Sequence, residues 1–248
     1  MNDLESELAR ARDLSVADLA DAIESIGFEC TRCGACCTAE DDDPHTATVF
    51  PDEVRRLQGA DLDAPTDGEG SADEDETDDG DADAGNVADR PQERDWRDVA
   101  RPMPYGLSEG PDGPEGETFE WALQTDGCGD CTFYSESEDG TGSCLAHADR
   151  PLVCRTYPFS VALGGTTQPM GEAVDEAGMV RAHECEGLGR DIDRADAEDL
   201  AAALKERSIR ELEEAIAVRE EYAPADPDSG EVVVHDSEGA KRPDGAPR

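Results

Sequence analysis

Nine cysteines are the residues of this 248-residue chain whose type and spacing can do chemistry. They form two groups, one with the spacing CxxCxxCC and one that starts with CxxC and continues with three separated cysteines. The first group is Cys30, Cys33, Cys36 and Cys37, and the second is Cys128, Cys131, Cys144, Cys154 and Cys185. Two cysteines separated by two residues place both sulfurs on one tight turn, where the thiolates can converge on a soft metal ion.

The number of thiols bounds the kind of metal site. Four thiolates close a tetrahedral zinc site, and four thiolates also hold a [4Fe–4S] cluster. Eight of the nine cysteines therefore supply two such sites or one polynuclear site. Because Cys36 and Cys37 are adjacent, we expect their side chains to diverge and to serve different metals, unless one of them is structural. Spacing does not choose between zinc and iron, so both metals stay open, including an iron–sulfur cluster.

Disulfides or buried free thiols are the alternative to a metal. The N-terminal segment MNDLESELARARDL has no basic stretch followed by an apolar one. We therefore expect no signal peptide and a cytoplasmic location. A reducing cytosol and the tight clustering of the cysteines argue against disulfides.

The composition excludes several classes of function. The formal net charge is −42, and Leu, Ile, Val and Phe make up only about 15% of the chain, which favours a small core or disorder. There is no basic patch to neutralise phosphates, so we expect no nucleic-acid partner. No run approaches the ~20 apolar residues of a membrane span. Acid spread along the chain with only two lysines, Lys205 and Lys241, indicates a protein adapted to high salt, with a disordered acidic protein as the alternative.

Helices are predicted on both sides of the cysteines. Ser15 and Asp18 have the spacing of a capping box, which predicts a helix over Val16–Ile26 that runs into the first group. Pro51 suits the first position of a short helix that ends near Gln58. Asp196–Tyr222 has an apolar stripe at helical spacing, and we expect that stripe to pack against the cysteine core.

Strands are predicted from extended and alternating patterns. Ala47–Phe50 reads as a short extended piece, and Phe119, Trp121 and Leu123 alternate with polar residues, as in a strand with one buried face. Phe159–Leu163 reads as another strand, ended by Gly164 and Gly165. Val232–Val234 fits a short edge strand in an otherwise loose segment.

These elements predict an α+β fold, a small loop-rich domain organised around a cysteine metal centre, with N-terminal and long C-terminal helices. The expected parts are an N-terminal helix with the CxxCxxCC group, a disordered acidic insertion, the remainder of the metal domain, the C-terminal helix and a loose acidic tail. Their boundaries are 1–60, 61–95, 96–190, 191–223 and 224–248.

The cysteine blocks resemble the YkgJ-like cysteine-cluster family, which is named for a CxxCxxCC signature and described as zinc- or iron-chelating. The matching segments are FECTRCGACC (28–37), Cys131 with Phe133, CLAHADRPLVCRTYPF (144–159) and Cys185. The resemblance implies eight metal ligands: Cys30, Cys33, Cys36, Cys37, Cys131, Cys144, Cys154 and Cys185. Cys128 is additional to the family's eight, and Glu186 replaces the proline that relatives carry after the last cysteine.

One arginine and three histidines have predicted roles or positions as well. Arg155 directly follows Cys154, and we expect it to donate to the negatively charged thiolates, with an exposed charge or a salt bridge to a surface acid as the alternative. His147 is expected to pack or lie at the surface, and His45 and His235 are expected to be exposed.

Three functions remain open. The leading one is metal binding with zinc or iron, and the protein partner, if any, is unknown. An iron–sulfur enzyme of redox or methyl-transfer type is one alternative, since flagellin lysine methylases have a similar cysteine cluster, although this chain has no glycine-rich nucleotide loop. A structural zinc scaffold for protein contacts is the other. An open cleft beside the thiols would favour the enzyme, and a closed, buried set would favour the scaffold.

Overall fold

The computed structural model of the chain describes residues 3–39, 45–62, 94–163, 173–175 and 178–248. Most of the expected acidic insertion over 61–95 lies outside these residues, and so do Gly164 and Gly165.

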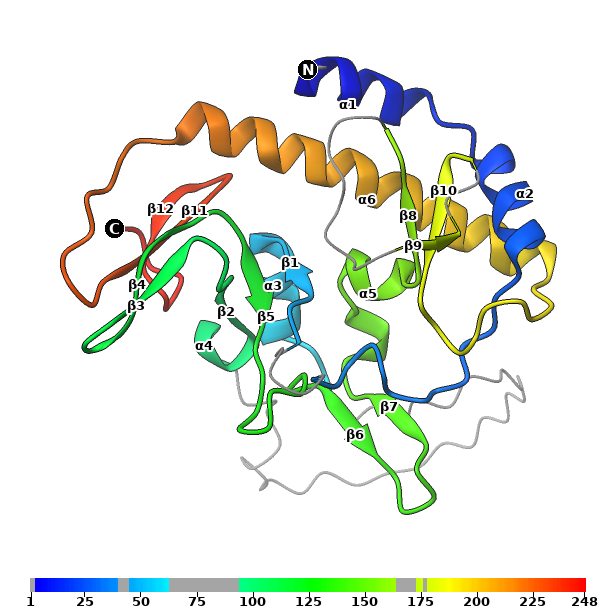
Figure 1. The fold of residues 1–248 in the computed structure, drawn as a ribbon, viewed down its shortest axis with the longest axis horizontal. Coiled ribbons are helices and arrows are strands. Elements are labelled where there is room, and N and C mark those ends of the chain that lie inside the picture. Colours follow the sequence, from blue (N-terminus) through cyan, green and yellow to red (C-terminus); the bar gives the residue numbers. More distant parts are fainter. Residues whose placement is uncertain (1–2, 40–44, 63–93, 164–172, 176–177) are drawn as a thin grey trace, which may run out of the picture.

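A long helix, α6 (Arg194–Glu221), runs along one side of the molecule, and two N-terminal helices pack against it (Figure 1). The second of these, α2 (Val16–Ile26), has the predicted bounds, because the Ser15 hydroxyl accepts a hydrogen bond from the Asp18 amide at 3.3 Å. The first, α1 (Leu4–Asp13), was not predicted, since half of its residues are charged. Its few apolar side chains, among them Leu8 and Ala11, pack against Leu212 of α6.

The apolar stripe of α6 builds the first core. Leu204 and Ala201 pack with Leu19 and Ile23 of α2 and with Phe159 of strand β8 (Phe159–Val161). Strand β8 is shorter than predicted and lies beside β10 (Val180–His183), which pairs in turn with β9 (Ala173–Asp175). Helix α6 packs on α2 and α1, on the short helix α5 (Leu152–Thr156) and, less extensively, on β8. Since α5 carries Cys154, α6 reaches the cysteine region through this helix, and packing of the stripe itself against the cysteine core stays a prediction.

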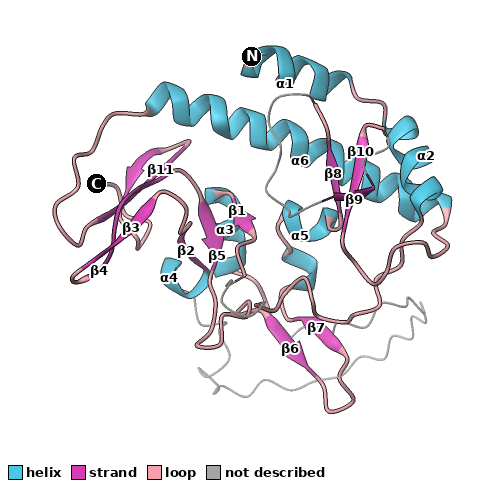
Figure 2. Ribbon diagram, viewed as in Figure 1, coloured by secondary structure: helices cyan, strands magenta, loops and turns pink. Residues whose placement is uncertain are grey.

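A second core lies on the other side of α5, among small sheets (Figure 2). Its buried members include Val54 and Leu57 of α3 (Pro51–Gln58), a helix that has the predicted bounds. The remaining elements are β1 (Thr48–Val49), α4 (Trp96–Val99), β2 (Ala100–Pro102), β3 (Leu107–Gly110), β4 (Gly113–Thr118), β5 (Trp121–Leu123), β6 (Tyr134–Glu136), β7 (Gly142–Cys144), the 3₁₀ turn η1 (His147–Asp149), β11 (Val232–Asp236) and β12 (Gly239–Lys241). The sheet orders are β1-β5-β2, β12-β11-β4-β3 and β6-β7.

Two strand predictions need correction. The strand predicted around Phe119 starts at Trp121, and all three residues of β5 are buried, because strands pair with it on both sides and both of its faces are covered. The prediction of a loose tail with an edge strand is wrong for 232–241. Strand β11 is an interior strand that pairs in parallel with β4, and Val233 and Val234 are fully buried. A partner more than a hundred residues away in the chain supplies this order, which local composition does not reveal.

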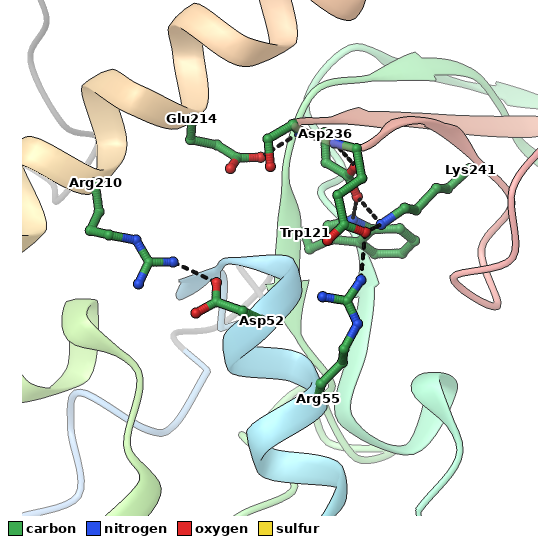
Figure 3. Close-up of polar contacts among 9 residues, drawn as sticks. Asp52, Arg55, Trp121, Arg210, Glu214, Asp236 and Lys241 are labelled. Atoms are coloured by element: carbon green, nitrogen blue, oxygen red, sulfur yellow. Dashed lines mark hydrogen bonds and ion pairs between the residues drawn. The ribbon is translucent and has the colours of Figure 1, made fainter.

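Polar contacts join the C-terminal sheet to α3 and α6 (Figure 3). Asp236 is 2% exposed, accepts a hydrogen bond from Trp121 Nε1 at 2.8 Å and pairs with Lys241 Nζ at 2.9 Å. Arg55 of α3 pairs with Glu238 in the turn between β11 and β12. Arg210 of α6 pairs with Asp52, so α3 is tied to both neighbours.

The α+β fold class predicted from the sequence is confirmed, with N-terminal helices on a long C-terminal helix and several small sheets. Among the described residues, the helices are too short or too polar to cross a lipid bilayer.

The buried Lys241–Asp236 pair predicts a large effect of one substitution. Lys241→Met leaves the buried Asp236 carboxylate without its cation and should lower the free energy of unfolding by about 3–5 kcal/mol. Arg12→Met is the matched control, because Arg12 and Glu213 form an ion pair whose side chains are 58% and 46% exposed. The control should lose less than about 1 kcal/mol. Urea unfolding in one buffer measures both variants, and equal losses would contradict the buried-pair argument.

Candidate metal centre

The first cysteine loop begins where α2 ends. Gly27 has a φ of +78°, a conformation that glycine adopts easily. Its Cα also lies close to the Arg190 carbonyl, since a Cβ at this position would be 2.4 Å from that oxygen. The following backbone pairs with the segment after Cys185, since the Glu29 amide donates to the Gly187 carbonyl at 3.0 Å. This pairing brings Cys30 and Cys185, which are far apart in the sequence, to the same side of the molecule.

A tight turn then presents the next three thiols. Gly34 has a φ of +79°, and the Cys37 amide donates to its carbonyl at 2.7 Å. A Cβ on Gly34 would lie 2.2 Å from Tyr134 Oη, so the turn packs against β6 only because this residue is glycine. The sulfurs of Cys36 and Cys37 lie 3.8 Å apart, so the predicted divergence of these side chains is wrong. The turn places both sulfurs on one side.

Cys131 and Cys144 are placed next to this turn by backbone hydrogen bonds. The Cys131 amide donates to the Cys37 carbonyl at 2.8 Å. Cys144 ends β7, where it lies opposite Tyr134 of β6. Cys131 is 7% exposed and Cys144 is partly buried, and both contact the second core.

Cys154 lies on α5, and buried charges hold both ends of that helix. The Glu53 side chain of α3 is 1% exposed and accepts a hydrogen bond from the Leu152 amide at 2.9 Å. At the other end, Arg207 of α6 is 2% exposed and donates to Thr156 Oγ1 at 2.9 Å. A carboxylate at the start of a helix and a cation at its end both match the helix dipole. Neither Glu53 nor Arg207 was singled out in the sequence, because their partners lie 99 and 51 residues away.

The thiols of these segments face one open cleft of about 2060 Å³. Eight of them line it, namely Cys30, Cys33, Cys36, Cys37, Cys131, Cys144, Cys154 and Cys185. Cys128 does not line it; that residue lies exposed on a turn where its amide donates to Asp126. Among the described residues, no three Cys, His, Asp or Glu side chains lie close enough to hold an ion without moving. Side-chain rotation would therefore have to bring the sulfurs together.

Burial raises the pKa values of several of these thiols and so favours their protonated form. It raises the pKa of Cys131 to about 11 and also raises the pKa values of Cys144 and Cys154. The hydrogen bond from Cys37 and, to a smaller extent, the charge of Arg150 together lower the pKa of Cys36 to about 7, against the effect of burial. The same hydrogen bond raises the pKa of Cys37, which acts as the donor. A metal ion that binds here must displace protons, so its affinity should rise with pH.

Arg150 is the cation whose charge reaches several of the thiols. Its charge helps to lower the pKa of Cys36, and it partly offsets the increase that burial causes in the pKa values of Cys144 and Cys154. Arg155 also lines the cleft, but its side chain is exposed and makes no hydrogen bond or ion pair with the residues that the structure describes. The predicted role of Arg155 as a donor to the thiolates stays a prediction, and Arg150 is better placed for it.

The three histidines considered in the sequence differ in their exposure to solvent. His147 is exposed on η1, as expected. His45 is partly buried, so the expectation that it is exposed is wrong; its Nε2 lies 3.1 Å from the Cys36 carbonyl oxygen, and burial lowers its pKa. The expectation that His235 is exposed is wrong. It is 1% exposed, because Phe119 stacks on its ring and Glu117 Oε1 lies 2.9 Å from its Nε2.

The position of Arg150 leads to a prediction about zinc affinity. Arg150→Gln removes the positive charge that acts on several thiols and should weaken zinc binding about 10-fold, the lower end of the range for groups around metal ligands. Arg155→Gln is the matched control and should change the affinity little. Competition with a chelator of known affinity, at fixed pH and salt, measures both variants. A larger loss in Arg155→Gln would restore the assignment made from the sequence.

Comparison with known proteins identifies the family. A family model described as "CxxCxxCC: Putative zinc- or iron-chelating domain" matches residues 29–186. No curated protein and no solved structure matches the chain. The matched segment covers more than half of the chain and runs from just before Cys30 to just after Cys185, which confirms the family predicted from the sequence. The chain therefore belongs to the CxxCxxCC family of zinc- or iron-chelating domains.

Proposed function

We propose that this chain holds zinc or iron through eight cysteine thiolates, with an iron–sulfur cluster as one form of the iron. The proposed ligands are Cys30, Cys33, Cys36, Cys37, Cys131, Cys144, Cys154 and Cys185. The observation that carries this proposal is that these eight thiols line one cleft, whereas the ninth, Cys128, lies outside it. The family match supports zinc or iron as the ion.

The residues present fit a thiophilic metal. Thiolates are the preferred ligands of zinc and of iron–sulfur clusters, and the cleft concentrates them. Cys30, Cys33 and Cys36 are exposed on a loop, so their side chains can turn toward an ion without disturbing the core. The bound metal would supply a fixed positive charge that links the first loop, β7, α5 and the segment after β10.

The openness of the cleft supports a second candidate function, a metal centre that a reactant can reach. Beyond the thiols the cleft continues along α6, where Arg207, Glu211 and Tyr222 line its wall. Burial raises the pKa of Glu211 to about 7, so this carboxyl group can exchange a proton near neutral pH. A redox or methyl-transfer enzyme needs such access, whereas a structural zinc scaffold does not.

Metal analysis with a visible absorption spectrum tests the proposal on protein purified without oxygen or chelators, in high salt. Iron with acid-labile sulfide and a brown colour would support a cluster and the enzymatic candidate. Zinc in a colourless protein would support metal holding and favour the scaffold. Folded protein that contains neither metal would overturn the proposal.

Serine variants check the ligand assignment. Cys154→Ser should lose at least half of the bound metal, and Cys128→Ser, the matched control, should keep all of it. Since Cys154→Ser places a hydroxyl in a packed region, Cys33→Ser is measured beside it, because Cys33 is exposed and its loss should not affect folding. Unchanged metal content in both Cys154→Ser and Cys33→Ser would contradict the assignment.

A further inference from the structure

Four of the eight thiols share one apolar environment. Cys131 is a buried member of the second core, and three partly buried cysteines, Cys37, Cys144 and Cys154, pack against that core. These four residues, the inner set, come from four separate segments: the end of the first loop, the turn before β6, β7 and α5. The short hydrogen bond from the Cys131 amide to the Cys37 carbonyl fixes two of them together.

The other four thiols lie outside that core. Cys30, Cys33 and Cys36 are exposed and Cys185 is partly buried, and they are called the outer set. The backbone before Cys30 pairs with the backbone after Cys185, since Phe28 lies opposite Leu188 and the Glu29 amide donates to the Gly187 carbonyl. The Gly187 amide also donates to Cys185 Sγ at 3.4 Å, the kind of contact that stabilises a thiolate ligand.

We infer that the eight thiols form two separate four-cysteine metal sites, one from the inner set and one from the outer set, which meet at the Cys36–Cys37 pair. This inference rests on the proposed function. Each set contains the four thiolates that one zinc ion or one [4Fe–4S] cluster requires. The sequence left open whether there are two such sites or one polynuclear site, and the structure favours two because the environments of the sets differ.

The close approach of Cys36 and Cys37 also allows a competing arrangement, in which both thiols bind the same ion. Zn–S bonds of about 2.3 Å make the edge of a tetrahedral site about 3.8 Å. The sulfurs of Cys36 and Cys37 are 3.8 Å apart, so these two thiols have the spacing of ligands to a single ion as well. In that arrangement Cys36 would join the inner thiols, and the outer thiols would lack a fourth member.

Zinc stoichiometry of paired variants tests the division. The full chain, reduced and loaded with zinc, should hold about two ions. Cys30→Ser/Cys185→Ser changes the outer set alone and should keep one ion, because both substitutions remove ligands of the same site and leave the inner site complete. Cys144→Ser/Cys185→Ser changes both sets and should keep none. Equilibrium dialysis with elemental analysis gives the counts, circular dichroism checks that each variant folds, and Cys128→Ser is the control that keeps both ions.

The outcomes separate the inference from the proposed function. One zinc in the full chain, or equal zinc in the two paired variants, would overturn the division but leave metal binding intact. No bound zinc or iron in the full chain would overturn both. The competing arrangement predicts one zinc in the full chain and the same single zinc in Cys30→Ser/Cys185→Ser, because the outer thiols would lack a fourth ligand. If Cys144→Ser prevents folding, the zinc content of Cys30→Ser/Cys185→Ser tests the division by itself, because these two residues lie outside the second core.

Discussion

The position of α5 is the constraint on which the rest of the molecule depends. This helix has only five residues and cannot be stable by itself. Glu53 and Arg207 hold its two ends with buried hydrogen bonds, and each is paired with a charge on its own helix: Glu53 with Arg56 at 3.7 Å and Arg207 with Glu211 at 2.8 Å. Because Glu53 comes from α3 and Arg207 from α6, α5 joins the two cores. Cys154 stays packed against the second core, as the other inner thiols are, only while both ends are held.

The sequence predicts those elements of the fold whose ends are determined by residues within one helical turn. The bounds of α2 and α3 are predictable because Ser15 accepts a hydrogen bond from the Asp18 amide and Pro51 occupies the first helical position, and both effects act within one turn. Strand β11 is a different case, since its order comes from the parallel partner β4, a glycine- and glutamate-rich segment with no strand pattern of its own. Helix α1 was missed because it needs only a narrow apolar face against Leu212.

The candidate site divides in the same way. Cysteine spacing singles out the thiols, since chelation needs several sulfurs close together and the chain provides them on tight turns. The residues that orient those thiols, Glu53 and Arg207, cannot be predicted from spacing, because each acts on a segment that is distant in the sequence. Arg150 lies four residues before Cys154, yet only the folded structure brings its charge to Cys36 and Cys144 as well.

The acidic surface and the thiolate centre act over different distances, which makes them compatible. Two tetrathiolate zinc sites would add about −4 to a chain whose formal net charge is already −42. At high salt the screening length falls to about 3 Å, so repulsion between the surface and the centre becomes small. The exposed arginine pairs, such as Arg219 with Glu5, weaken under the same conditions. Contacts withdrawn from solvent are screened much less, so the buried hydrogen bonds that Glu53 and Arg207 make to α5 would continue to position Cys154 at a salt concentration that removes most surface electrostatics.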